Sequence, residues 1–89
     1  MASRKLLKAN INAVCFDIID ECLTLHDFEN VSEEKIRPLL NDAIQFRNDL
    51  ITRFGKARKS ENAAAEYKKM ELELDEKTLE FIDRLNELQ

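Results

Sequence analysis

The sequence predicts an all-α fold, an antiparallel up-down-up bundle of three helices. Apolar residues recur at helical spacing in three stretches, each of about 22 to 27 residues. Two polar breaks separate these stretches, and the 89 residues include one glycine and one proline, which favours long helices over sheets. Short connections make successive helices antiparallel. We therefore expect residues 1–89 to form one helical-bundle domain.

The first helix is expected at about residues 4–26. Its core stripe falls within an arc of about 100° when each residue advances by 100°. The members of this stripe are Leu7, Ile11, Val14, Cys15, Ile18, Cys22 and Leu25. A second stripe, Phe16, Ile19 and Leu23, widens the apolar arc by about another 100°. One neighbouring helix cannot cover that width, so this helix is expected to contact two neighbours or a partner chain.

The second helix is expected at about residues 33–55. Ser32 is a typical N-cap, and Glu33 follows where negative charge meets the helix dipole. Val31 and Ile36 have the spacing of a hydrophobic staple. The core stripe comprises Ile36, Leu39, Leu40, Ala43, Phe46, Leu50, Phe54 and Ala57. Gly55 and the polar residues after it predict the end of this helix.

The third helix is expected at about residues 62–88. Its core face carries Ala63, Tyr67, Met70, Leu74, Thr78, Phe81, Leu85 and Leu88. Leu72 and Leu79 point away from that face and lie seven residues apart on one line, so they form a candidate contact surface. The alternative to a bundle is a single helical pair in which residues 55–62 stay helical. Gly55 and the polar stretch favour the loop.

The two cysteines predict reduced, buried side chains. Cys15 and Cys22 are seven residues apart, which separates them by about 10.5 Å along a helix. A disulfide needs Cα atoms closer than about 7 Å. His26 is the only histidine and cannot complete a zinc site with so few other ligands. We therefore expect no metal, no cofactor and no membrane segment. We expect a cytoplasmic location.

Charge is distributed unevenly along the expected bundle. The start of helix one, the end of helix two and the start of helix three share one end. This basic end gathers nine of the fourteen basic residues: Arg4, Lys5, Lys8, Arg53, Lys56, Arg58, Lys59, Lys68 and Lys69. Asp49, Glu61 and Glu66 reduce its net charge to +6, while the remaining five basic and fifteen acidic residues sum to −10. The whole chain carries −4, which argues against general nucleic-acid binding, although a basic patch can hold phosphates or an acidic protein.

Arg47 departs from the pattern because it lies inside the apolar stripe of the second helix. A partly buried cation needs a partner. Counting back from the second turn places Arg47 level with Glu71, so an interhelical ion pair between them is expected. The alternative is an anion or ligand pocket between the helices.

The start of the chain carries a family resemblance. The run Arg4-Lys5-Leu6-Leu7-Lys8, followed by Ile11-Asn12, Val14-Cys15 and Asp20-Glu21-Cys22, resembles small α-helical bundle proteins of the Bacteroidetes. No activity is assigned to that group. The resemblance thus implies the helical fold and no catalytic residues.

Three function classes follow from these observations. The favoured one is a protein-interaction or assembly module, binding itself as a homodimer or another protein. Its expected partner surface comprises Phe16, Ile19, Leu23, Leu72 and Leu79. The alternative is a binder of nucleic acid or another polyanion through the basic end. An enzyme is not expected, because one glycine cannot build a phosphate-binding loop and the sequence shows no motif for a Ser/His/Asp set.

Overall fold

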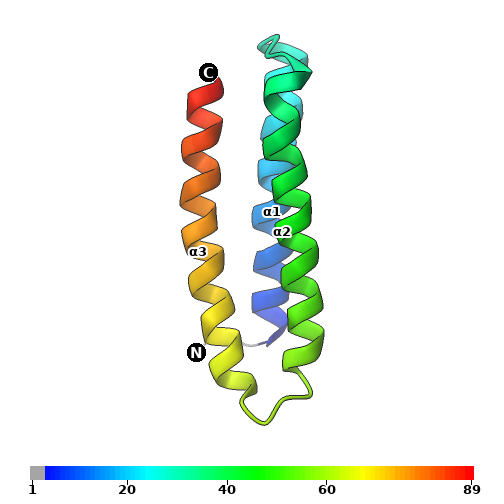
Figure 1. Cartoon of the computed structure of the whole chain (residues 1–89), viewed down its shortest axis with the longest axis vertical. Coiled ribbons are helices and arrows are strands. Elements are labelled where there is room, and N and C mark those ends of the chain that lie inside the picture. Colours follow the sequence, from blue (N-terminus) through cyan, green and yellow to red (C-terminus); the bar gives the residue numbers. More distant parts are fainter. Residues whose placement is uncertain (1–3) are drawn as a thin grey trace.

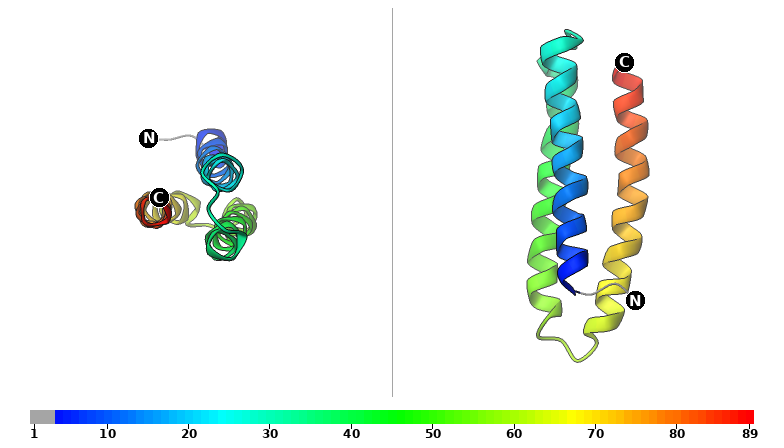
Figure 2. Two further views of the ribbon diagram at one scale, coloured as in Figure 1. Left: turned by 90° about the horizontal axis from the view of Figure 1, so that it is seen from above. Right: turned by 180° about the vertical axis from the view of Figure 1, so that it is seen from behind.

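The computed structural model describes residues 4–89, and these form three helices in chain order. They are α1 (Arg4–Phe28), α2 (Glu33–Ala57) and α3 (Ala63–Leu88) (Figure 1). α1 and α3 run in one direction and α2 in the other, and the three lie at the corners of a triangle when seen along the bundle (Figure 2). The predicted all-α up-down-up bundle is confirmed. Within residues 4–89, no helix is both long and apolar enough to span a membrane.

The first turn closes around a residue in the left-handed conformation. Asn30 has φ 57°, a region that asparagine tolerates better than most side chains. The N–H of Val31 then donates to the carbonyl of Leu25 at 3.1 Å, which closes the end of α1 two residues beyond the predicted end. Ser32 occupies the predicted N-cap position, and its carbonyl accepts the N–H of Ile36 at 3.2 Å.

The second turn begins later than predicted. α2 continues through Gly55 to Ala57, because this glycine keeps a negative φ and does not reverse the chain. The turn occupies residues 58–62, where the N–H of Asn62 donates to Ser60 Oγ at 3.0 Å. The alternative of one continuous helix over residues 55–62 is therefore wrong.

The core consists of two clusters joined by one aromatic side chain. Every buried apolar side chain of residues 4–89 belongs to one of the three predicted stripes. The cluster near the first turn contains Ile18, Cys22, Leu25, Ile36, Leu39, Ala43, Phe81 and Leu85. The other cluster contains Leu7, Ile11, Leu50, Phe54, Met70 and Leu74. Phe46 packs against both clusters and presents its ring to Phe81 edge to face, with centroids 5.9 Å apart.

Cross-helix contacts fix the register between α2 and α3. Besides the Phe46–Phe81 ring contact, Arg84 Nη1 lies 2.8 Å from Asp42 Oδ2 on α2. These contacts slide α3 toward the second turn, so its first residues extend past the end of α2 and its last residues stop short of the first turn (Figure 1). The two turns therefore differ: α1 and α2 form a tight hairpin, and α3 is offset along its length.

The two cysteines are reduced and buried as predicted. Cys15 and Cys22 are free thiols with no exposed surface, each within or beside a core cluster. Burial raises the pKa of both thiols, and the positive charges of Arg47 near Cys15 and Arg84 near Cys22 oppose that rise. A raised pKa and a closed environment both lower the concentration of reactive thiolate.

We expect neither cysteine to react with a thiol reagent such as Ellman's reagent in the native protein over minutes. Both should react within seconds in about 6 M guanidinium chloride, where the whole chain is exposed. The measurement is the absorbance of the released thiolate over time. Native labelling as fast as labelling of the unfolded chain would show that the helices open around these residues.

Candidate functional site

Two rows of side chains line the outer side of the α1–α2 hairpin. Asn12, Phe16, Ile19 and Leu23 follow one another on α1 at spacings of four, three and four residues. Leu40, Ile44, Arg47 and Ile51 follow one another on α2 at the same spacings. Residues spaced in this way share one side of a helix.

Arg47 joins these two rows. Its Nε donates to Asn12 Oδ1 at 3.0 Å, and its guanidinium carbon lies 5.8 Å from the centroid of the Phe16 ring. Nη1 also donates to Asn48 Oδ1 at 3.2 Å. The amide and the ring thus accept the cation where a carboxylate had been expected, and an aromatic face attracts a guanidinium.

The expected ion pair between Arg47 and Glu71 is wrong for two reasons. Arg47 lies on the side of α2 that faces α1, whereas Glu71 is on α3. The register also differs, because Arg84 pairs with Asp42 and Arg53 pairs with Glu73 across α2 and α3. In that register, Arg47 and Glu71 lie about two helical turns apart along the bundle axis. Arg47 is also not among the residues that line the groove between α2 and α3.

The rows leave an apolar strip uncovered by the third helix. The strip consists of Phe16, Ile19 and Leu23 on α1 and Leu40 and Ile44 on α2. Phe16 is 51% exposed, Leu23 49% and Ile44 41%, while the other two are half-buried. α3 packs on the opposite side of the hairpin (Figure 2, left). The α1/α2 strip is therefore a continuous exposed apolar surface along the hairpin.

The sequence placed Phe16, Ile19 and Leu23 in a partner surface and left Leu40 and Ile44 out of it. The missed signal was the spacing of Leu40 and Ile44 with Arg47, which marks a second row on the same side. Leu72 and Leu79 are exposed on α3, 57% and 66% respectively. Because they are on a different corner of the triangle, the structure does not bring them together with the α1/α2 strip.

The basic end is assembled as expected from the start of α1, the end of α2 and the start of α3 (Figure 1). Two of its nine cations are engaged: Arg53 pairs with Glu73 at 2.6 Å, and Lys69 lies 3.6 Å from Glu66. The other seven form no ion pair within the described part of the chain: Arg4, Lys5, Lys8, Lys56, Arg58, Lys59 and Lys68. Their positive charge is thus available to an outside group.

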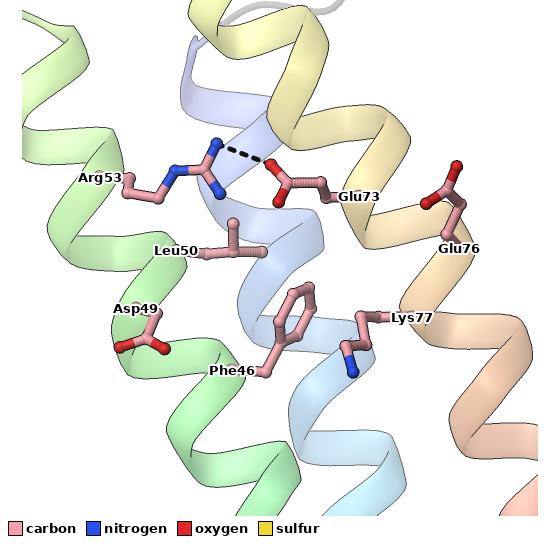
Figure 3. A pocket seen from close by; sticks show the side chains of 7 residues that line it. All are labelled: Phe46, Asp49, Leu50, Arg53, Glu73, Glu76 and Lys77. Carbon is pink, nitrogen blue, oxygen red and sulfur yellow. Dashed lines mark ion pairs between the residues drawn. The ribbon is translucent and has the colours of Figure 1, made fainter.

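A shallow groove of about 260 Å³ lies between α2 and α3. Its floor is formed by Phe46 and Leu50, and the Arg53–Glu73 ion pair crosses one end (Figure 3). The hydrogen bond from Arg53 holds the pKa of Glu73 below its ordinary value of 4.5, and Glu73 in turn raises the pKa of Arg53. The groove's remaining charges, Asp49, Glu76 and Lys77, are of both signs, so it concentrates no single charge.

Metal-ligating side chains are not clustered among residues 4–89. No group of three or more histidine, cysteine, aspartate or glutamate side chains is placed to hold a metal ion. The single histidine, His26, is exposed and contacts the neighbouring Asp27 at 3.1 Å. Comparison with protein-family models, curated proteins and solved structures yields no match. The resemblance to Bacteroidetes bundle proteins stays a prediction.

Arg47 and Asn12 should show energetic coupling. We expect Arg47→Met and Asn12→Ala, combined in a double-mutant cycle, to differ from additivity by about 0.5–1.5 kcal/mol, because each change removes the same half-buried hydrogen bond. Urea unfolding of the four proteins measures the coupling. The control is Arg47→Met combined with Glu71→Gln, which should be additive within about 0.5 kcal/mol. Coupling to Glu71 and none to Asn12 would contradict the observed contact.

The Arg53–Glu73 pair should make stability depend on pH. Because the folded pKa of Glu73 is lowered, its contribution is present above pH 4.5 and is lost as the pH falls through the folded value. Glu73→Gln should therefore lower the free energy of unfolding at pH 7 and have little effect near pH 2.5. Both side chains are partly exposed, at 39% and 45%, so we expect a loss of about 0.5–1 kcal/mol. The control Glu76→Gln removes a carboxylate from the same groove without removing an ion pair, so it should lower the free energy of unfolding at pH 7 by less than Glu73→Gln does.

Proposed function

We propose that this chain is a protein-interaction or assembly module and that the α1/α2 strip is its partner-binding surface. The exposure of Phe16, Leu23 and Ile44 on one face is the observation that carries this proposal. A small domain buries little surface, and leaving large apolar side chains in water forgoes about 25 cal/mol for each Å² that could be covered. Covering the strip with another protein recovers that free energy.

Arg47 supports the proposal because it makes the strip more suitable for docking. Its head is held by Asn12 and Phe16, so the charge beside the strip is already engaged before any partner binds. A surface whose polar groups are already paired loses less free energy when a partner displaces its water. Apolar and aromatic side chains together with arginine are also the residues most often found at the centre of interfaces. The two reduced cysteines fit a cytoplasmic setting for this activity.

Polyanion binding through the basic end is the second candidate. It is favoured by the exposed cluster of Lys56, Arg58 and Lys59 at the second turn, none of which forms an ion pair within residues 4–89. The exposed apolar strip has no part in that function. The strip therefore favours the interaction module over the polyanion binder.

The interaction module predicts site-specific cross-linking at the strip. A photoreactive phenylalanine analogue at position 16 or 44, introduced in cells that express the protein, should give protein adducts after illumination. The same group at Leu79 on α3 should give few or none. Adducts at position 44 should also be lost when Phe16→Ser and Leu23→Ser are added, because these changes remove apolar contact area while leaving the core intact.

Three results would contradict parts of this function. Adducts at Leu79 alone would move the partner surface to α3, and no adducts at any position would remove the interaction module. Retention of the wild-type protein on heparin at low salt, lost on changing Lys56, Arg58 and Lys59 to Glu and weakening steeply with salt, would support the polyanion binder in its place.

A further inference from the structure

The two rows that contain the α1/α2 strip, residues 12–23 and 40–51, are centred within two residues of the middles of α1 and α2. Phe16 is the middle residue of α1, which runs from Arg4 to Phe28, and Ile44 lies one residue from the middle of α2, which runs from Glu33 to Ala57. A two-fold rotation can place such a surface against the same surface of a second copy. The apolar middles of the two copies then face each other.

The two ends of the same face carry opposite charge. Toward the second turn, Lys5, Lys8 and Arg58 lie on the sides of their helices that carry the two rows, and each is exposed. Toward the first turn, the face ends in a group of exposed acidic residues. They are Asp27, Glu29 and Glu33. Arg37 pairs with Glu33 at 2.7 Å and still leaves this end net negative.

In the middle of the face, Arg47 is engaged, and the exposed Asp20, four residues after Phe16 on α1, adds a negative charge on the side toward the acidic end. The two carboxylates on the central part of α2 are turned toward α3, since Asp42 pairs with Arg84 and Asp49 lines the α2/α3 groove. The polar residues beside the strip, Asn41 and Asn48, are uncharged. From one turn to the other, the face is therefore basic, apolar and acidic in sequence.

We infer that the occupant of the α1/α2 strip is a second copy of this chain, docked antiparallel about a two-fold axis perpendicular to the helices. This inference rests on the proposed function. The half-turn lays each α1 along the other α1, so Lys5 of one copy comes level with Asp27 of the second copy. Arg58 likewise comes level with the acidic first turn, near Glu29. Between these two charged contacts, Phe16 of one copy meets Phe16 of the second copy, and Leu23 comes level with Ala9 of the second copy.

The opposite, parallel arrangement joins like charges. It would bring Lys5, Lys8 and Arg58 of both copies together at one end and the acidic turns together at the other, where like charges destabilise association. Electrostatics thus selects the antiparallel dimer. The available area is also adequate: two helices about 37 Å long and together about 20 Å wide offer roughly 700 Å². Specific interfaces bury about 800 Å² on each partner.

The charge layout permits a test by exchange. Changing Lys5, Lys8 and Arg58 to Glu gives an all-acidic face, and changing Asp27, Glu29 and Glu33 to Lys gives an all-basic face. Each variant alone should dimerise at least about tenfold more weakly than the wild type at low salt. An equimolar mixture should restore a dimer, because both contacts again join opposite charges. Sedimentation equilibrium measures the masses, and circular dichroism confirms that each variant is helical.

The matched control changes three cations at the same end that lie off the face. Lys56, Lys68 and Lys69 changed to Glu alter the net charge by the same amount, and the dimer dissociation constant should then change less than threefold. Phe16→Ser with Ile44→Ser should give a folded monomer, because it removes the centre of the interface and no buried residue.

A distance measurement distinguishes the two orientations. A spin label on Glu61→Cys, at the second turn, reacts at the one accessible thiol because Cys15 and Cys22 are buried. In the antiparallel dimer, the two labels should lie at opposite ends, separated by a distance comparable with the 48 Å length of the molecule. Pulsed dipolar spectroscopy measures that separation.

The outcomes separate this inference from the proposed function. A dimer with distant labels and rescue by the mixed variants supports the antiparallel pair. Labels close together, or a dimer indifferent to both charge changes, would overturn it. A monomer at all concentrations up to about 0.5 mM would also overturn it, while strip-dependent adducts to a different protein would leave the interaction module standing.

Discussion

The rest of this structure depends on how little apolar surface a three-helix bundle can bury. Each helix turns one stripe to a shared interior, and the side chains of two clusters occupy that interior along α1, α2 and α3. α1 carries apolar residues over about twice the arc that such an interior covers. Phe16 and Leu23 therefore stay half exposed. The bundle cannot enclose them by repacking, because their burial would turn Cys15 and Cys22 outward. An outside surface is the remaining way to cover them.

The fold and its core were predictable because they depend on periodicity alone. Helix direction, the burial of each stripe and the sharing of one end by nine cations all follow from the spacing of apolar residues and the two breaks. The ends of the helices were less predictable. Asn30 closes α1 by taking a left-handed conformation, which its sequence neighbours did not require, and Gly55 stays helical although glycine is the usual residue at a helix end.

The position of Arg47 could not be predicted because it depends on two quantities that a single helix does not encode. One is the rotation of α2 about its own axis, which decides whether Arg47 faces α1 or α3. The other is the sliding of α3 along α2, which is set by Phe46 against Phe81 and by the ion pairs at Asp42 and Arg53. Counting residues outward from the middle of the second turn gives the correct level only if α3 does not slide along α2. The second turn allows it, since residues 58–62 let α3 begin beyond the end of α2.

The basic end has one physical property and two proposed uses. Its cations attract negative charge, whether that charge belongs to a polyanion or to the first turn of another copy. The two kinds of partner differ in what accompanies the charge. A polyanion offers charge alone and is repelled by the acidic remainder of the chain, although at physiological salt that repulsion fades beyond about 8 Å. A second copy, docked as proposed, presents its acidic first turn while the apolar middles of the two faces meet. In the proposed antiparallel dimer, apolar burial and charge pairing add over one face, so the layout that weakly attracts any anion would favour another molecule of this chain over a polyanion.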